Sequence, residues 1–195
     1  MNILYCGDKP MQKGILLSSM SLIGNVEEPL NIYILTVDYS EKGVNYNPVD
    51  KAFAKYLERK LNKSDIGVNV FLVDVTRYFV EELPEANMQS RFTACCMLRL
   101  FADKTDIKER VLYLDTDVLC RKDFSDFYYQ NMDGIEIAGV SDYYGRWLFG
   151  DGYINSGVML MNMKAIRENG ILEKCREQCI RKEMFMPDQT AINLS

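Results

Sequence analysis

Two aspartates separated by one residue are the strongest candidates for chemistry in this sequence. Asp115 and Asp117 directly follow the apolar run Val-Leu-Tyr-Leu at 111–114. Such a run is typical of a strand buried on both faces of a mostly parallel sheet, and ligands bind beyond the carboxyl ends of these strands. Two carboxylates there would suit Mg²⁺ or Mn²⁺ carrying a phosphate ligand. Carboxylates just past a strand are more often turn formers or helix caps, so the spacing alone leaves both interpretations open.

Alternating strands and helices must position these aspartates. Periodicity predicts strands at 2–6, 30–37, 68–73, 110–114, 135–140 and 152–162. It predicts helices at 10–23, 49–61, 93–102, 164–183 and from 187 onward, with loops at 38–48 and 142–152 and a short helix or turn at 124–128. This alternation predicts an α/β fold with a mostly parallel central sheet flanked by helices.

Polar residues also occur at other predicted strands. Gly7 and Asp8 follow the strand at 2–6, where Asp8 could hydrogen-bond the base or ribose of a nucleotide. A turn aspartate is the more ordinary role at such a position. The Asn-Ser-Gly insertion at 155–157 interrupts the last predicted strand, which indicates a bulge or a close approach of the backbone to a ligand. We therefore expect several strands to contribute to one site.

The composition limits the classes of protein that fit. The chain of 195 residues is 48% hydrophobic and 26% charged, which predicts one globular domain with a substantial core. A net charge of −5 argues against non-specific nucleic-acid binding, which needs a basic face. No apolar run is long enough to span a membrane, and the first residues do not resemble a secretory signal. The cytoplasm is therefore the expected location.

The cysteines and the missing histidine limit the chemistry further. The sequence has six cysteines and no histidine, and no two cysteines have Cys-x-x-Cys spacing. The usual zinc sites and the Ser-His and Cys-His nucleophile arrangements are therefore excluded. Without an export signal, the cysteines are expected to be free thiols. Chemistry here must rely on carboxylates, amides, hydroxyls and a metal ion.

Five segments, in their order along the chain, resemble glycosyltransferase family 8, the retaining nucleotide-sugar transferases that include bacterial galactosyl- and glucosyltransferases and glycogenin. The resemblance covers essentially the whole chain and is most specific in the third and fourth segments. The segments are 2–8 (Asn-Ile-Leu-Tyr-Cys-Gly-Asp), 98–100 (Leu-Arg-Leu), 111–119, 153–162 and 187–189 (Pro-Asp-Gln). The resemblance implies a Rossmann-like GT-A fold that binds a nucleotide sugar, in one catalytic domain over 1–195.

The resemblance also implies an activity and its metal. The expected reaction is transfer of a hexose, with retention, from UDP-glucose or UDP-galactose to a saccharide, glycolipid or glycoprotein acceptor. Asp115 and Asp117, with Thr116 between them, would hold Mn²⁺ or Mg²⁺ against the donor diphosphate and so neutralise the charge on the departing UDP. Gly7 and Asp8 would contact the nucleoside.

The remaining candidates are implied to surround the donor sugar. Arg99 would lie near the sugar or the aspartates, unless it is an exposed helix cation. Asn155 and Gln189 would lie beside the sugar, and Asp188 would bond its hydroxyls. A further candidate for a sugar contact is Asp142, which fits a turn at a strand end equally well. Because the amide of Gln189 is a poor nucleophile, we expect front-face attack by the acceptor.

One part of the family pattern is absent. The family's third metal ligand is a histidine in a C-terminal segment of the form His-x-Gly-x-x-Lys-Pro-Trp, which this sequence lacks. The helix beginning at Pro187 also stops after about two turns, which is marginal without a further segment to pack on. We therefore expect a chain lacking its C-terminal part, including any basic region that contacts the inner face of the membrane, and impaired in catalysis.

Three alternatives remain open. The absent ligand makes a non-catalytic sugar-nucleotide-binding domain the main one, and a structural α/β domain without ligand is another. A nucleotidyltransferase also has metal-binding aspartates at strand ends, but it usually begins with a glycine-rich, basic phosphate loop. The corresponding turn here, at 6–10, has one glycine and one lysine, which argues against that activity.

Overall fold

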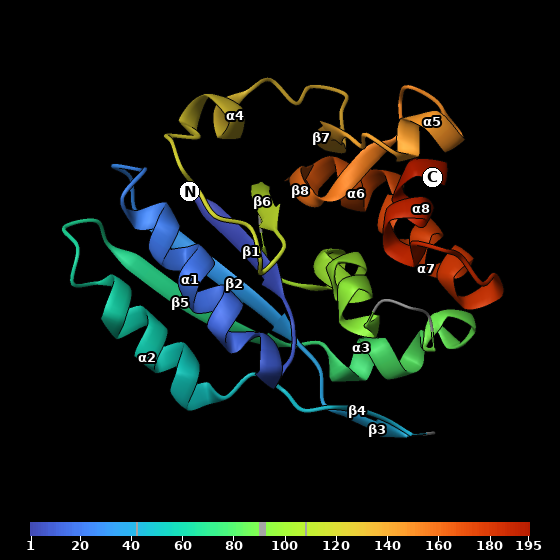
Figure 1. Cartoon of the computed structure of the whole chain (residues 1–195), viewed down its shortest axis with the longest axis horizontal. Coiled ribbons are helices and arrows are strands. Elements are labelled where there is room, and N and C mark those ends of the chain that lie inside the picture. The colour runs from blue at the N-terminus through green and yellow to red at the C-terminus, as the bar shows by residue number, and fades with distance from the viewer. Residues whose placement is uncertain (42, 90–92, 108) are drawn as a thin grey trace.

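A six-stranded mixed sheet forms the centre of the molecule (Figure 1). The computed structural model describes residues 1–41, 43–89, 93–107 and 109–195. In spatial order the strands are β5 (Val68–Asp74), β2 (Leu30–Thr36), β1 (Asn2–Cys6), β6 (Arg110–Leu114), β8 (Ile154–Asn162) and β7 (Ile137–Ser141). The first four are parallel neighbours, and β8 runs antiparallel to both β6 and β7. The predicted α/β fold with a mostly parallel sheet is confirmed.

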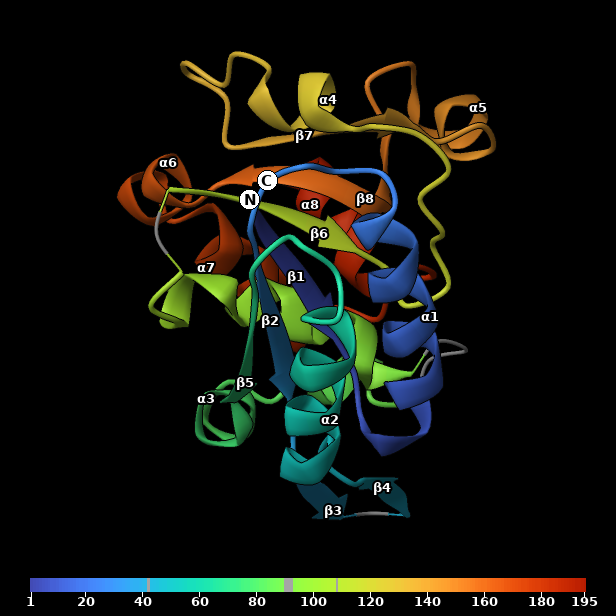
Figure 2. The ribbon, with the colours of Figure 1, turned by 90° about the vertical axis from the view of Figure 1, so that its left-hand side faces the viewer.

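Helices cover both faces of the sheet because alternate strand residues point to opposite faces. On one face, Ile3 and Tyr5 of β1 belong to the core that α1 (Gln12–Ile23) and α2 (Lys51–Leu61) cover (Figure 2). On the other face, Leu4 and Cys6 pack into a second core. The elements over that second face are α3 (Thr76–Glu81), η2 (Glu85–Asn87), η3 (Ala94–Lys104), α6 (Met163–Asn169), α7 (Ile171–Arg181) and α8 (Pro187–Leu194).

The 3₁₀ helix η3 is long for its kind and mostly buried. Runs of more than three or four residues are uncommon in this conformation, which often marks a functional segment. Thr93 caps its first turn by accepting a hydrogen bond from the Cys95 backbone N–H at 3.0 Å. The buried guanidinium of Arg176 on α7 donates to the carbonyl of Leu100 and, at 2.7 Å, to the carboxylate of Asp103. These bonds fix η3 against the sheet.

The structure differs from the predicted elements in several places, and α3 and η2 form where no element was predicted. The single helix predicted at 164–183 is wrong, because Gly170 adopts φ +63° and separates α6 from α7. The predicted loop at 38–48 contains the hairpin strands β3 (Tyr39–Glu41) and β4 (Val44–Tyr46), with residue 42 outside the described residues. The predicted loop at 142–152 contains the short helix α5 (Gly145–Phe149). Propensity identifies the ends of elements poorly where tertiary contacts decide them.

The remaining described elements are two short helices, η1 (Lys9–Met11) and α4 (Ser125–Tyr129). All six cysteines are free thiols, as predicted. Among the described residues, none of the helices has the length and apolar character needed to cross a lipid bilayer.

Candidate active site

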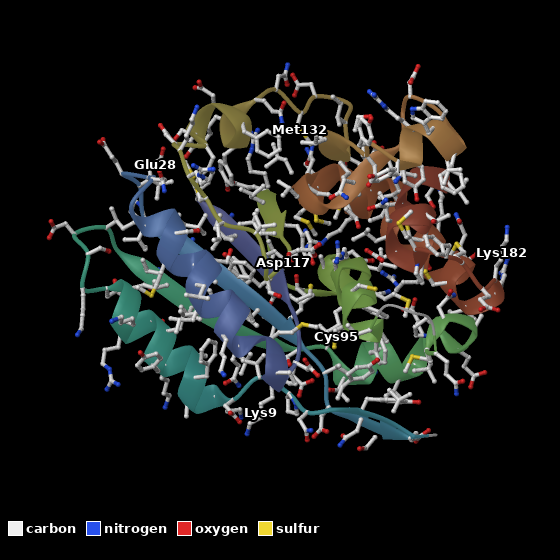
Figure 3. The ribbon with its side chains drawn as sticks, in the orientation of Figure 1. Lys9, Glu28, Cys95, Asp117, Met132 and Lys182 are labelled. Carbon is white, nitrogen blue, oxygen red and sulfur yellow. The ribbon has the colours of Figure 1, made fainter. Side chains whose placement is uncertain are left out.

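Two adjoining pockets lie at the carboxyl end of β6 and share Cys96, Arg99 and Asp115. The first, of about 300 Å³, we name the β6 pocket; it is lined by Cys6, Met11, Thr93, Cys95, Cys96, Arg99, Tyr113, Asp115, Thr116 and Asp117. The second, of about 240 Å³, we name the β8 pocket; it is lined by Cys96, Arg99, Asp115, Asp142, Asn155, Ser156, Gly157, Met186, Asp188 and Gln189. Figure 3 shows Asp117 and Cys95, which both line the β6 pocket, near the middle of the molecule.

These pockets bring together eight of the ten predicted site residues, all except Gly7 and Asp8. A larger pocket, of about 460 Å³, lies between α2 and the strands β2 and β5, but none of the predicted residues lines it. Convergent polar groups identify a functional site better than volume does. The paired pockets at β6 are therefore the candidate active site.

Arg99 of η3 is the centre of the polar network. Its side chain is 4% exposed, and Nη2 donates to Asp115 Oδ1 at 2.9 Å. Nη1 donates to the Ser156 carbonyl at 2.5 Å, and Nε lies 3.3 Å from Asp188 Oδ2. Burial alone would lower the pKa of Arg99, but Tyr113 and the two carboxylates raise it above its ordinary value. Arg99 is thus a buried, paired cation beside the aspartates and not an exposed helix cation.

Asp115 is held on one side and open on the other. Its Oδ1 accepts hydrogen bonds from Arg99 and, at 2.7 Å, from the hydroxyl of Tyr113. Its Oδ2 faces Gly157, where an added Cβ atom would lie only 2.8 Å away. The pairing of β7 with β8 shifts register between Gly139 and Ser141, opposite this segment, which agrees with the predicted bulge, whereas the predicted approach to a ligand stays a prediction. Asp117, two residues on, is exposed.

The two aspartates fit a metal ion that takes its other ligands from outside the protein. In the described part of the chain, no group of three or more His, Cys, Asp or Glu residues could hold a metal. Mg²⁺ is commonly bound by one or two carboxylates together with water and substrate phosphates. Asp115 Oδ2 would be crowded by any side chain at position 157, because an added Cβ atom would lie 2.8 Å from it. The oxygen ligands present suit Mg²⁺ or Mn²⁺ better than a softer metal.

The β8 pocket has a wall of side chains that hold one another. Asp142 Oδ2 accepts from Asn155 Nδ2 at 3.0 Å and from Gln189 Nε2 at 3.4 Å. Gln189 Oε1 accepts from the Ser156 N–H at 3.0 Å, and Asp188 Oδ2 accepts from the Ser156 hydroxyl at 3.0 Å. Asp188 and Gln189 are each 5% exposed. The predicted sugar-side residues therefore lie together, with Asp188 turned toward Arg99.

Gly7 and Asp8 lie at the carboxyl end of β1, beside β6 in the sheet. The Gly7 N–H donates to the Leu35 carbonyl at 3.0 Å, which fixes the turn. Asp8 is 8% exposed, and burial raises the pKa of its carboxyl. Their contact with a nucleoside stays a prediction.

Tyr113 and Ser156 are among the site residues that were not predicted from the sequence. Tyr113 looked like one more apolar residue of the buried run, and Ser156 looked like part of a bulge. Residues two apart on a strand share a face, so Tyr113 had to point to the same side as a following Asp115 in extended conformation. The alternation of side chains between the two faces of the strand could therefore have identified Tyr113 as a neighbour of Asp115. Ser156 had no comparable signal, because its partners Arg99, Asp188 and Gln189 are distant in the sequence.

Gly14 of α1 sets the position of the aspartate loop. An added Cβ atom there would lie 2.6 Å from the backbone carbonyl oxygen of Thr116, which cannot rotate away as a side chain can. We expect Gly14→Ala to displace Thr116 and to weaken Mn²⁺-dependent UDP binding, although alanine favours helix by about 1 kcal/mol over glycine. Calorimetric titration with UDP and Mn²⁺ measures the effect.

The matched control is Gly24→Ala at the end of the same helix. Gly24 has no atom within 4 Å of an added Cβ, and its φ of −80° suits alanine. We expect this variant to bind as the wild type does. Equal binding by both variants would show that the contact between Gly14 and Thr116 does not position the site.

Asp142 anchors the loop that follows it. Its pKa lies below the usual 3.8, because Asn155 and the Gly145 N–H donate hydrogen bonds to the carboxylate. A carboxyl with a depressed folded-state pKa stabilises the structure above its unfolded pKa, and the contribution is lost as the pH falls through the folded value. We therefore expect the loop to loosen below pH 3.8.

Trp147, the only tryptophan, lies in this loop and reports the change through its fluorescence anisotropy. The anisotropy should fall as Asp142 is protonated, and far-ultraviolet circular dichroism identifies any global unfolding. Asp142→Asn should show no such step. The same acid transition in the variant would assign the change to other groups.

The sequence matches one protein family over almost its whole length. The model of Glycosyl transferase family 8 matches residues 2–195. The chain is 26% identical over 140 residues to the probable glycosyl transferase Gly of Streptococcus gordonii, covering 71% of this chain and 20% of that protein. It is 22% identical over 209 residues to the lipopolysaccharide 1,2-glucosyltransferase of Escherichia coli, covering 99% of this chain and 58% of that protein. The chain thus spans only part of the length of these relatives.

Solved structures share the fold. An active-site mutant of LgtC superposes with a TM-score of 0.78 at 20% identity, covering 99% of this chain and 69% of that chain. The glycosyltransferase GlyE of Streptococcus pneumoniae TIGR4 superposes with a TM-score of 0.73 at 20% identity, covering 99% of this chain and 42% of that chain. Both have the GT-A fold, so the predicted fold is confirmed. Since the family match begins at residue 2 and extends to residue 195, this chain belongs to glycosyl transferase family 8.

Proposed function

We propose that this chain forms the catalytic domain of a metal-dependent, retaining glycosyltransferase that transfers a hexose from UDP-glucose or UDP-galactose. The observation that carries the proposal is the meeting of the two pockets at Asp115. Carboxylates suited to a metal and a diphosphate lie on one side of it, and the amides of Asn155 and Gln189 lie on the other. A nucleotide sugar likewise has a charged diphosphate, which such a metal would bind, and a sugar whose hydroxyl groups the amides could hydrogen-bond.

The β6 pocket would take the diphosphate end of the donor. Asp115 and Asp117 would hold Mn²⁺ or Mg²⁺, which supplies Lewis-acid stabilisation of the charge on the departing UDP. Arg99 is 4% exposed and held by Asp115 and Asp188, so it would orient the aspartate more than contact phosphate. Asp8 would bind the nucleoside from the neighbouring end of β1.

The β8 pocket would take the sugar. The amide of Gln189 is held at both ends, by Asp142 at Nε2 and by the Ser156 N–H at Oε1. A side chain fixed in this way is suited to positioning a sugar and not to forming a covalent bond with it. This supports front-face attack by the acceptor, with the departing diphosphate holding the positive charge that develops on the sugar carbon.

The acceptor would be a saccharide, glycolipid or glycoprotein. The name of the Escherichia coli relative, a lipopolysaccharide 1,2-glucosyltransferase, supports a glycolipid or polysaccharide among these. A domain that binds the sugar nucleotide without catalysis is the second candidate. The observation in its favour is that the described residues offer no cluster of three metal-ligating side chains.

Two measurements on this chain distinguish the candidates. Calorimetric titration with UDP, with and without Mn²⁺, tests the site, and release of free sugar from UDP-glucose and UDP-galactose tests the catalysis. We expect metal-dependent binding of UDP together with slow donor hydrolysis. Binding without hydrolysis would favour the non-catalytic domain, and absence of binding would contradict both candidates.

A further inference from the structure

We propose that Tyr113 is a positioning residue of the metal site, whose hydroxyl together with Arg99 holds Asp115 Oδ1 and so leaves Oδ2 as the oxygen that binds the metal. The inference rests on the proposed function, because it concerns the metal that this function requires. It assigns a role to a residue inside the buried strand β6 and a different role to each oxygen of one carboxylate.

The first step is the saturation of Asp115 Oδ1. This oxygen accepts a hydrogen bond of 2.7 Å from the Tyr113 hydroxyl and one of 2.9 Å from Arg99 Nη2. A carboxylate oxygen offers about two lone-pair positions, and both are taken here. Across the described residues, no hydrogen bond reaches Oδ2.

The second step is the space at Asp115 Oδ2. An added Cβ atom at Gly157 would lie 2.8 Å from this oxygen and 3.0 Å from Asn155 Oδ1. The backbone of β8 is held in place there, because the Asp115 N–H donates to the Gly157 carbonyl at 2.8 Å. A side chain at position 157 would therefore crowd Oδ2 from the side of the β8 pocket, and glycine avoids this contact.

The third step is the rigidity of Tyr113 itself. Tyr113 is 1% exposed, and the Arg99 guanidinium lies 4.1 Å above the centre of its ring. The ring cannot turn away without disturbing the core on that face of the sheet. Its hydroxyl therefore reaches Asp115 from a fixed direction and sets the angle of the carboxylate.

Hydrogen bonds from neighbouring residues to a metal-binding side chain orient that side chain. Their loss typically lowers metal affinity by about 10–100-fold. Tyr113→Phe removes only the hydroxyl and keeps the ring under Arg99. We expect this variant to bind Mn²⁺ in the presence of UDP about tenfold more weakly than the wild type. Electron paramagnetic resonance of free Mn²⁺ measures this affinity without any turnover.

The matched control is Tyr5→Phe in the neighbouring strand β1. Tyr5 is fully buried, and its hydroxyl shares a hydrogen bond of 2.8 Å with the Ser18 hydroxyl on the opposite face of the sheet. Both variants lose one buried tyrosine hydroxyl bond. Thermal unfolding should therefore report similar losses of stability, while only Tyr113→Phe should lose metal affinity.

The outcomes separate this inference from the function on which it rests. Wild-type protein that fails to bind Mn²⁺ with UDP overturns both. Wild-type binding with unchanged affinity in Tyr113→Phe overturns the role of Tyr113 alone, and so does an equal loss in Tyr5→Phe. If Tyr113→Phe does not fold, Gly157→Ala carries the test, because its methyl group would block Oδ2 while leaving the Tyr113 hydroxyl in place. Unchanged Mn²⁺ affinity in Gly157→Ala would contradict the assignment of Oδ2.

Discussion

Asp117→Asn should abolish Mn²⁺-dependent UDP binding while leaving the free energy of unfolding close to that of the wild type. Asp117 is exposed, so its replacement by an amide of the same shape disturbs no packing. Asp117 is one of the two carboxylates proposed to hold the metal, so its loss removes half of the charge that they bring to the ion. The loss of metal affinity should exceed the roughly 10–100-fold loss that follows removal of a hydrogen-bond partner of a ligand. The reason is that this variant removes the ligand itself. Calorimetry with UDP and Mn²⁺, beside urea unfolding, measures the two quantities.

The matched control is Asp65→Asn, which neutralises another exposed aspartate in the turn between α2 and β5. Both variants change the net charge from −5 to −4, so any general effect of charge on binding is shared. Asp65→Asn should bind as the wild type does. Wild-type binding by Asp117→Asn would place the metal elsewhere, and equal losses in the two variants would assign the effect to net charge.

The strands and the aspartate pair were predictable because the signals for them are local. The predicted strands at 2–6 and 110–114 coincide with β1 and β6. Both are short apolar runs that end in polar residues, and both are buried on two faces. The carboxyl ends of neighbouring parallel strands meet at one edge of a sheet, which placed Asp8 and Asp115 near each other in advance.

The division between α6 and α7 was not predictable from hydrophobic periodicity. Ile166, Leu172 and Cys175 are buried on the same side of the molecule, so the apolar pattern continues across the break. The signal that was available is the dipeptide Asn169-Gly170, since glycine at this position commonly ends a helix in the left-handed conformation. The periodicity of the flanking residues outweighed it in the prediction.

The ion pairs within the site could not be predicted from the sequence, because they join residues that are far apart along the chain. The sequence suggested Arg99 near the aspartates only through the family resemblance, and an exposed helix cation was the alternative. Its partners are Asp115, which directly follows β6, and Asp188 of α8, and both are distant from Arg99 in the sequence. Alternative roles for a charged residue are distinguished by burial, which the sequence does not give.

Arg99→Met should be the most destabilising single change in the site. The guanidinium is 4% exposed and pairs with Asp115 and with Asp188, whose side chain is 7% exposed. Removing one partner of a buried ion pair typically costs about 3–5 kcal/mol, because the other charge is left buried without compensation. Methionine fills a similar volume, so the loss should reflect the unpaired carboxylates and not a cavity. Urea unfolding gives the free energy, and Mn²⁺-dependent UDP binding should weaken in parallel.

Two further variants show whether the buried carboxylate is the cause. Arg77→Met removes an exposed arginine whose pair with Glu81 spans one turn of α3, and such surface pairs contribute little, so its stability should stay near that of the wild type. Adding Asp188→Asn to Arg99→Met removes the unpaired charge, so the double variant should be more stable than Arg99→Met alone. A double variant destabilised by the sum of the two single changes would mean that Arg99 and Asp188 contribute independently. The pairing would then not be what holds η3 and α8 together behind Asp115.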